Sequence, residues 1–165
     1  MDPSQAPTSR VRIQAGDFDL NTEIAALRAQ DLRVGAVCSF VGTVRDRTAG
    51  TPGSISSMEL EHYPGMTEKA IEAMIDEAQR RFDILGVRVI HRIGLLKPLD
   101  QIVMVAVTSA HRSESFQACE FLMDYLKTQA PFWKKEQTPQ GAYWVDARVT
   151  DDAALAKWGI EARNA

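Results

Sequence analysis

Hydrophobic and polar residues follow two periods along the chain, one typical of strands and one typical of helices. Alternation and β-branched residues predict strands over these ranges: 11–15, 35–45, 55–63, 87–93, 101–109, a short segment directly after Pro131, and 143–149. Apolar residues at spacings of three and four predict helices over these ranges: 19–30, 67–82, 113–129, and a last one from Asp151 or Asp152 through Trp158. Segment 101–109 is apolar on both faces, which predicts a central strand covered on both sides.

The order of these elements predicts an α+β fold, in which helices pack on a mainly antiparallel sheet. The connections between consecutive strands within 35–63 and within 87–109 are too short for parallel crossovers. A length of 165 residues fits one domain. We expect that domain over 10–150, after a disordered tail rich in Pro and Ser over 1–9 and before a C-terminal helix or tail over 151–165.

The third predicted helix and the segment after it bring two lysine regions together. Thr67 and Ser113 are expected to cap the second and third helices with their hydroxyl groups. Four apolar residues predict the buried face of the third helix: Phe116, Cys119, Met123 and Leu126. Pro131 ends that helix, because proline lacks an N–H and disfavours a helical residue before it. Lys127 therefore lies in the last turn, and Lys134 follows just beyond the break.

Composition is that of an ordinary globular protein, with 45% hydrophobic and 25% charged residues. The formal net charge of −3 implies no general attraction to nucleic acid or to an anionic membrane, so a local basic cluster is informative. Cys38 and Cys119 lie in apolar segments and are expected to be buried free thiols. The first residues lack the basic and apolar blocks of a signal peptide, and we expect a cytoplasmic protein.

Basic residues at the ends of predicted elements form the candidate site. Arg45 ends one strand, while His111 and Arg112 follow another strand and precede a helix. Helix N-termini favour anions, and arginine presents two parallel donors to phosphate. We therefore expect these three residues to share an anion pocket, with phosphate the preferred anion. The alternative is that they are ordinary solvated surface charges.

Lys127 and Lys134 are candidates for the chemistry. A lysine that is partly desolvated and close to other cations can act as a base or a nucleophile. The alternative for Lys127 is that it only complements the negative end of its helix. The three histidines lie on separate segments without metal-ligand spacing, so no metal is expected, and His91 is interpreted as a core histidine.

Five sequence blocks carry a resemblance to a known family: FVGTVRD (40–46), LEHYPGMTEKA (60–70), VIHRIG (89–94), VTSAHRSESF (107–116) and MDYLKTQAPFWKKE (123–136). In these blocks the chain resembles the large, catalytic subunit of molybdopterin synthase. The resemblance implies an α/β hammerhead-type fold with a small β subdomain. It also implies a homodimer that binds one small ubiquitin-like subunit at each outer end, making a heterotetramer.

The implied reaction is a sulfur transfer. The partner's C-terminal Gly-Gly would carry a thiocarboxylate, which enters the pocket as the sulfur donor. Cyclic pyranopterin monophosphate would be the substrate and molybdopterin the product, with no bound cofactor. Two alternative hypotheses are a non-catalytic module that binds a phosphorylated ligand, and a scaffold that only binds a ubiquitin-like protein.

The resemblance also implies the residues of the site. Lys127 and Lys134 would be catalytic. The substrate site would be lined by Thr43, Val44, Arg45, His111, Arg112, Lys127, Lys134, Lys135 and Glu136. Phe40 and Met123 match positions that line the pocket, and Arg148 matches a position that can reach across the dimer.

Overall fold

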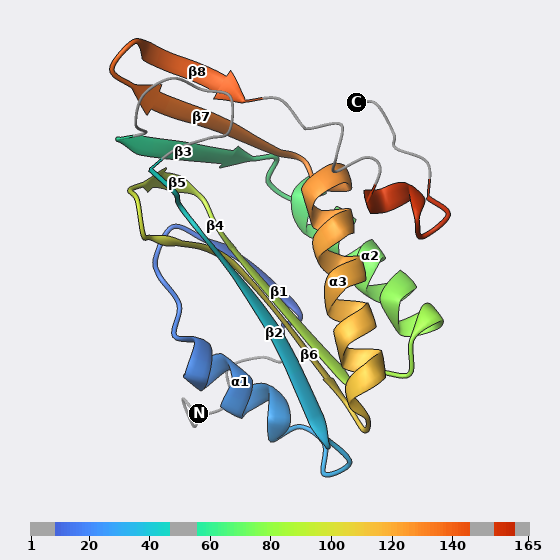
Figure 1. Cartoon of the computed structure of the whole chain (residues 1–165). Coiled ribbons are helices and arrows are strands. Elements are labelled where there is room, and N and C mark those ends of the chain that lie inside the picture. The colour runs from blue at the N-terminus through green and yellow to red at the C-terminus, as the bar shows by residue number, and fades with distance from the viewer. Residues whose placement is uncertain (1–8, 47–55, 146–153, 161–165) are drawn as a thin grey trace.

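The computed structural model describes residues 9–46, 56–145 and 154–160. Its elements are, in chain order, β1 (Val11–Gln14), α1 (Leu20–Arg28), β2 (Ala36–Thr43), β3 (Ser57–His62), α2 (Met66–Arg81), β4 (Gly86–Arg92), β5 (Gly94–Leu96), β6 (Gln101–Ser109), α3 (Arg112–Gln129), β7 (Phe132–Thr138) and β8 (Gly141–Val145). The predicted α+β class is confirmed (Figure 1).

The strands form two sheets of four (Figure 1). The first sheet has the order β1-β4-β6-β2, in which only the β1–β4 pair is parallel. The second sheet has the order β5-β3-β7-β8 and is antiparallel throughout. The expectation of mainly antiparallel pairing is therefore confirmed. The second sheet crosses one end of the first and corresponds to the β subdomain that the resemblance implied.

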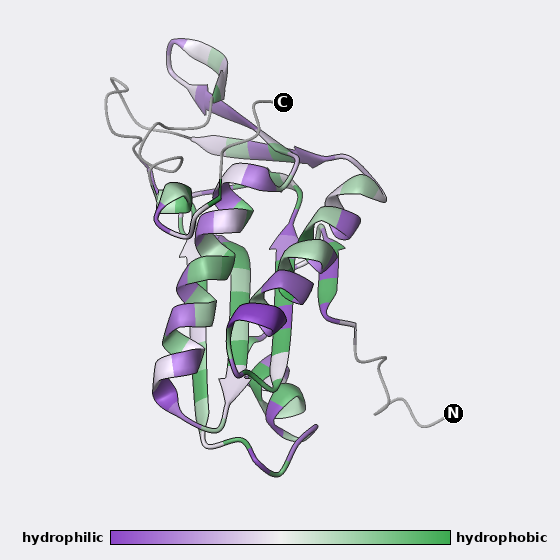
Figure 2. Ribbon diagram, turned by 90° about the vertical axis from the view of Figure 1, so that its right-hand side faces the viewer, coloured by the Kyte–Doolittle hydropathy of each residue, from purple (hydrophilic) through white to green (hydrophobic). Residues whose placement is uncertain are grey.

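The first sheet is covered on both faces, as the apolar run of β6 predicts. Helices α2 and α3 pack on one face, over a core that includes Val89, Val105 and Phe121. Helix α1 packs on the other face, where Ile90 and Met104 are fully buried. In Figure 2 the strands between the helices are largely hydrophobic, whereas each helix alternates between hydrophobic and hydrophilic residues. Each helix therefore keeps one polar face toward solvent.

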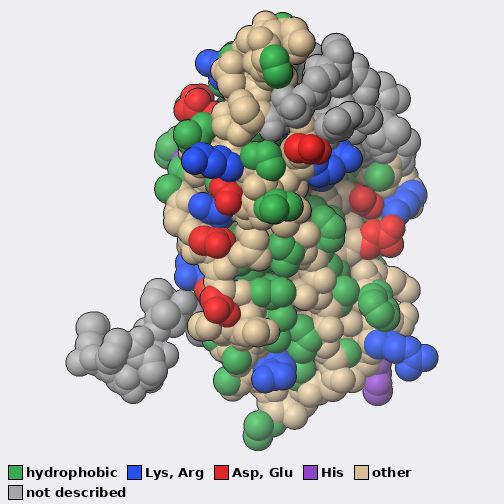
Figure 3. Space-filling view, turned by 60° about the vertical axis from the view of Figure 1, so that its left-hand side comes forward, with side chains coloured by type: hydrophobic (Ala, Val, Ile, Leu, Met, Phe, Trp, Pro, Cys, Tyr) green, Lys and Arg blue, Asp and Glu red, His purple; other side chains and the backbone are tan. Residues whose placement is uncertain are grey.

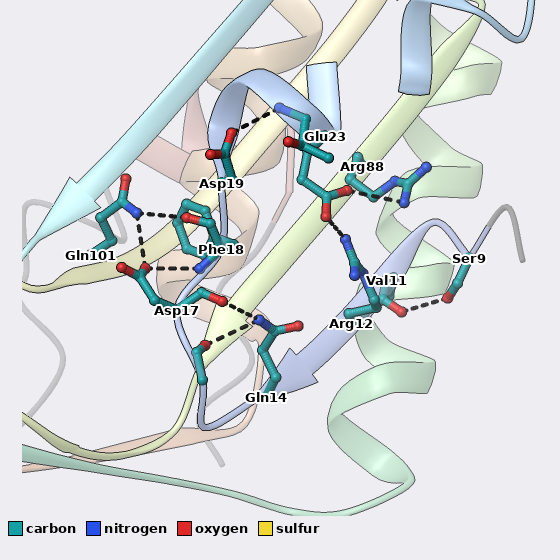
Figure 4. A network of polar contacts seen from close by, with 12 residues as sticks. Ser9, Val11, Arg12, Gln14, Asp17, Phe18, Asp19, Glu23, Arg88 and Gln101 are labelled. Atoms are coloured by element: carbon teal, nitrogen blue, oxygen red, sulfur yellow. Dashed lines mark hydrogen bonds and ion pairs between the residues drawn. The ribbon is translucent and has the colours of Figure 1, made fainter. Parts of the chain in front are cut away.

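Charged groups hold α1 on the sheet (Figure 4). The Asp19 carboxylate caps α1 by accepting from the Thr22 N–H at 2.9 Å. One turn later, Glu23 accepts from Arg12 on β1 and from Arg88 on β4, the latter at 3.3 Å. Arg88 is buried, and desolvation lowers the pKa of its guanidinium group. A carboxylate shared by two strands therefore fixes the helix over the sheet.

Two predicted helix caps are wrong. Gly65, with φ of +84°, is the N-cap of α2, and Glu68 accepts from its N–H at 2.6 Å. Thr67 lies inside the helix and is buried. His111 is the N-cap of α3, so Ser113 is the second residue of that helix and is exposed. In both cases the N-cap lies two residues before the predicted one, so the hydroxyl residue falls inside the helix.

The predicted buried face of α3 is largely confirmed. Cys119 and Leu126 are buried and Met123 is half-buried, but Phe116 is 62% exposed, which contradicts the prediction for that residue. The pKa of the Cys119 thiol is raised to about 12, chiefly by burial and to a lesser degree by the neighbouring Cys38. Both cysteines are free thiols, and Cys38 is half-buried.

Several smaller predictions changed or fall outside the described residues. Strand β5 was missed, because a strand of three residues that begins with a glycine carries too little alternation. Strand β8 ends at Val145, while the rest of the segment predicted to 149 is outside the described part. The same holds for the tail over 1–8, for Asp151 and Asp152, and for Arg148. The described C-terminal segment has a single helical turn over 154–156 before Trp158. Among the described residues, none of the helices combines the length and the hydrophobicity that a membrane-spanning helix needs.

Candidate active site

The two candidate catalytic lysines flank a sharp corner between α3 and β7. Helix α3 ends at Gln129, as Pro131 predicts, and Lys127 lies exposed in its last turn. Strand β7 begins at Phe132. Lys134 is therefore the third residue of the strand, and the corner separates it from Lys127 by only seven positions.

Lys134 and Lys135 point to opposite faces of the second sheet, because they are consecutive residues of one strand. Lys134 pairs with Leu60 of β3 and shares the face that packs toward the first sheet. On that face, Glu136 is 3% exposed, and its Oε1 lies 3.4 Å from Lys134 Nζ. Lys135 lies on the outer face, 5.7 Å from the ring centre of Trp144. The inner face thus presents an ammonium group held beside a buried carboxylate.

Arg45 reaches the same junction of the two sheets from β2. Val44 donates its N–H to the Asp100 carbonyl at 2.9 Å, and its carbonyl accepts from the Leu99 N–H at 2.9 Å. The Val44 side chain is buried against Met58 and Leu60 of β3. These contacts fix the backbone next to Arg45, whose side chain is exposed. Arg45 therefore lies at the end of the molecule that carries Lys134.

His111 and Arg112 lie at the other end. They begin α3, and about 22 Å of helix separates Arg112 from Lys127 at 1.5 Å per residue. In the β2–β6 pair, Ala36 faces Ser109, two residues before His111, whereas Thr43 faces Gln101 at the far end. Within one chain, Arg45 therefore lies at the opposite end from His111 and Arg112, and the three residues do not share a pocket there.

Each end has its own surroundings. His111 and Arg112 line an open hollow whose other walls are Gly35, Ala36, Ala110, Ser113 and Phe116. Figure 3 shows Lys and Arg side chains near both ends of one face of the molecule, with hydrophobic side chains between them. Strand β2 is the edge strand of the first sheet on this side, and its Phe40 is 41% exposed. The two cationic regions are thus joined by apolar surface rather than by a common pocket.

The corner beside the lysines has a buried histidine at its base. His91 on β4 is 7% exposed, and its ring stacks on Phe132 with 3.8 Å between ring centres. Its Nδ1 donates to the Arg92 carbonyl at 2.8 Å, so the predicted core histidine is confirmed. Burial, helped by the nearby charges of His62 and Lys127, lowers the pKa of His91 to about 4. The ring is neutral near neutral pH.

Sequence reasoning missed the role of Thr67 at this corner. Its hydroxyl donates to the Pro131 carbonyl and accepts from the Tyr63 N–H, each at 2.9 Å. The available signal was the position of Thr67 within EHYPGMTEKA, directly after a turn, but that position was interpreted as a helix cap. No group of three or more His, Cys, Asp or Glu in the described residues could hold a metal ion.

The fold and this site define a class: a two-sheet α+β protein with lysine and arginine side chains gathered where its sheets meet. The profile of the MoaE protein family matches residues 13–129. A molybdopterin synthase catalytic subunit from Ralstonia nicotianae is 63% identical over 155 residues, which cover 94% of this chain and 87% of that relative. The chain belongs to the MoaE family, and its function is that of the catalytic subunit of molybdopterin synthase in molybdenum cofactor biosynthesis.

Solved structures agree with the fold. A molybdopterin biosynthesis MoaE protein from Burkholderia ambifaria is 60% identical, with a TM-score of 0.80 over 93% of this chain and 99% of that one. A complex of subunits 1 and 2 of molybdopterin-converting factor from Helicobacter pylori gives a TM-score of 0.69 over 85% of this chain and 92% of that one. At 18% identity, this second likeness shows the fold alone.

Proposed function

We propose that this chain catalyses sulfur transfer to cyclic pyranopterin monophosphate, giving molybdopterin, with the C-terminal thiocarboxylate of a small ubiquitin-like partner as the sulfur donor. The observation that carries the proposal is the corner between α3 and β7, which has Lys127 in the last turn of the helix and Lys134 at the third position of the strand. Arg45 follows Val44, which is buried against β3 of the same sheet as Lys134. The substrate and the donor are both anionic. A junction lined by cations attracts both and stabilises the negative charge that develops during the transfer.

The two lysines have distinct roles in this proposal. Lys127 acts at the reacting carbon or at the thiocarboxylate carbonyl, where a proton must move and negative charge accumulates. Lys134 holds the anionic substrate, and the buried carboxylate of Glu136 beside it orients its ammonium group. By the family resemblance, Thr43, Val44, Phe40 and Met123 would line the surrounding wall. Lys135 belongs to the same implied set, but it lies on the outer face of the second sheet, away from the face that carries Lys134.

A second copy of the chain completes the pocket. The exposed edge of β2 is apolar and carries Phe40, while the neighbouring face of α3 carries the exposed Phe116. A two-fold axis near the middle of β2 would set the strands of two copies antiparallel. The His111 and Arg112 end of one copy would then meet the Arg45 and Lys127 end of the other. This arrangement accounts for basic residues that one chain holds about 22 Å apart.

The small partner follows from the same family resemblance. In the Helicobacter pylori structure, subunit 1 is bound to subunit 2 of molybdopterin-converting factor. By analogy, each copy of this chain would bind one ubiquitin-like subunit, whose C-terminal Gly-Gly enters the cationic pocket. Two catalytic and two small subunits would make a heterotetramer.

The test is an assay of molybdopterin formation with thiocarboxylated partner and cyclic pyranopterin monophosphate. Lys127→Ala should lose activity by at least about a hundredfold, the scale of general acid–base catalysis. Lys127→Arg should also lose most activity, because guanidinium differs from ammonium in shape and does not release its proton. Lys69→Ala serves as the matched control, since Lys69 is an exposed lysine on α2.

Near-normal turnover in a folded Lys127→Ala variant would refute the proposed role of Lys127. Binding of the pterin phosphate without any turnover in the native protein would instead support a non-catalytic ligand-binding module. Partner binding without substrate binding would support a scaffold.

A further inference from the structure

The corner between α3 and β7 is held by residues that belong to other elements. Ala130, the C-cap of α3, has an extended backbone, and the Phe132 N–H donates back to the Ala130 carbonyl at 2.9 Å. Pro131 between them cannot donate a backbone hydrogen bond. The turn therefore has little hydrogen bonding of its own, and its direction depends on contacts with residues of other elements.

The first of these contacts is made by Thr67 in the first turn of α2. Its hydroxyl donates to the Pro131 carbonyl at 2.9 Å and accepts from the Tyr63 N–H at 2.9 Å. Thr67 is fully buried, so neither bond competes with solvent. A single side chain thus ties the corner to the end of β3 and to α2.

The second contact is made by His91 at the end of β4. Its ring lies nearly parallel to that of Phe132, with 17° between the ring planes and 3.8 Å between the centres. Phe132 is also paired with His62 on β3, so the first residue of β7 is held both in its sheet and against the other sheet. The hydrogen bond from Nδ1 to the Arg92 carbonyl fixes the orientation of the His91 ring.

We propose that Thr67 and His91 are positioning residues for the sulfur-transfer site, which hold the α3–β7 corner so that Lys127 and Lys134 face the same substrate. The inference rests on the proposed function. Lys127 is four residues before Pro131, and Lys134 is three residues after it. Any change in the angle at the corner therefore moves one lysine relative to the other. A misplacement near 1 Å in a catalytic site can cost about a hundredfold in rate.

The chemistry of His91 suits this position. A protonated ring beside Lys127 would place two like charges at the base of the site. Burial keeps the ring neutral, because it lowers the pKa to about 4, and the charges of His62 and Lys127 act in the same direction. The ring therefore supplies a flat, uncharged surface for Phe132.

The experiment compares matched pairs of variants in the molybdopterin-forming assay. His91→Phe keeps an aromatic ring for stacking, whereas His91→Leu keeps the volume but loses the flat face. Thr67→Ser keeps the hydroxyl, whereas Thr67→Val keeps the shape without it. We expect kcat/KM to fall about tenfold to a hundredfold in His91→Leu and Thr67→Val. Thr67→Ser should remain within about threefold of the native protein. His91→Phe keeps the stacking face but loses the hydrogen bond to the Arg92 carbonyl, so its kcat/KM should lie between those of the native protein and His91→Leu.

Stability is measured in parallel, and all rates are taken well below the unfolding temperature of each variant. If His91→Leu does not fold, the Thr67 pair still decides the matter. A second readout is non-additivity: in a Lys127→Ala background, Thr67→Val should lower the residual rate by less than about threefold. A merely structural role would lower it by the same factor in both backgrounds.

The outcomes separate the two proposals. If native protein does not form molybdopterin, or if Lys127→Ala is as active as native protein, the proposed function fails. If native protein is active and Lys127→Ala is not, but folded His91→Leu and Thr67→Val match native protein, then the positioning role is refuted and the proposed function stands.

Discussion

Acidification should destabilise this protein through His91, and the size of the effect follows from its burial. In the folded chain the pKa of His91 is lowered to about 4, from an ordinary value of 6.5, chiefly because the ring is buried. Between these two values the unfolded chain binds a proton that the folded chain does not. Stability is therefore complete above pH 6.5 and is lost as the pH falls toward 4.

The expected loss is at most about 3 kcal/mol, since each unit of pKa shift is worth about 1.4 kcal/mol. Below pH 4 the loss from this residue should level off, because both states are then protonated. The charged or titratable groups that act on His91 are His62 on β3 and Lys127 on α3, and both disfavour its protonation. Phe132 on β7 is the uncharged contact.

The assay is urea unfolding of the native protein and of His91→Phe at several pH values from 7.5 to 4. The difference in unfolding free energy between the two proteins isolates His91, because other titrating groups are common to both. That difference should shift in favour of His91→Phe by up to about 3 kcal/mol as the pH falls. A difference that does not change with pH would show that His91 is not buried in its neutral form, and the reasoning would be wrong.

Two further predictions concern the fold. Phe121→Ala should lower the unfolding free energy by about 3–5 kcal/mol, because Phe121 is fully buried in the main core. Leu32→Ala, at a fully exposed position, should change it by less than about 0.5 kcal/mol. Urea unfolding measures both variants, and equal effects would contradict the described core. Gly35→Ala should destabilise the chain by about 1–3 kcal/mol, because the added Cβ would lie 2.4 Å from the backbone carbonyl oxygen of Ala110. Gly16→Ala has open space around its Cβ and should be nearly neutral. Thermal unfolding compares the two variants, and a Gly35→Ala protein as stable as the native protein would refute the close contact.

Local elements followed from local patterns. The apolar run of β6 predicted a strand covered on both faces, and Pro131 predicted that the third helix ends near Gln129, where α3 does end. Local geometry was weaker at the helix starts, where Gly65 and His111 take the cap positions predicted for Thr67 and Ser113. Capping depends on the turn before the helix, and a hydroxyl residue nearby can serve another contact instead.

The candidate site divides in the same way. The lysine pair was predictable, because a helix end, a proline and a strand start are all encoded within one stretch of about ten residues. The position of the anion-binding residues could not be predicted. Arg45, His111 and Arg112 all lie at strand or helix ends, and a sequence does not show which ends meet. The register of β2 against β6 places Arg45 and His111 at opposite ends.

By itself, the sequence determined the class of fold, the family and the order of cationic groups along the chain, since periodicity, proline and motif identity are local properties. Only the tertiary structure decided which of those groups are neighbours. The reason is that α3 is a rigid helix, which separates Arg112 from Lys127 by about 22 Å. The fixed register of β2 against β6 likewise keeps Arg45 and His111 at opposite ends, although all four residues are basic and were expected in one site. The same structure brings Thr67 and His91, which are distant in sequence from the lysines, to the corner between them.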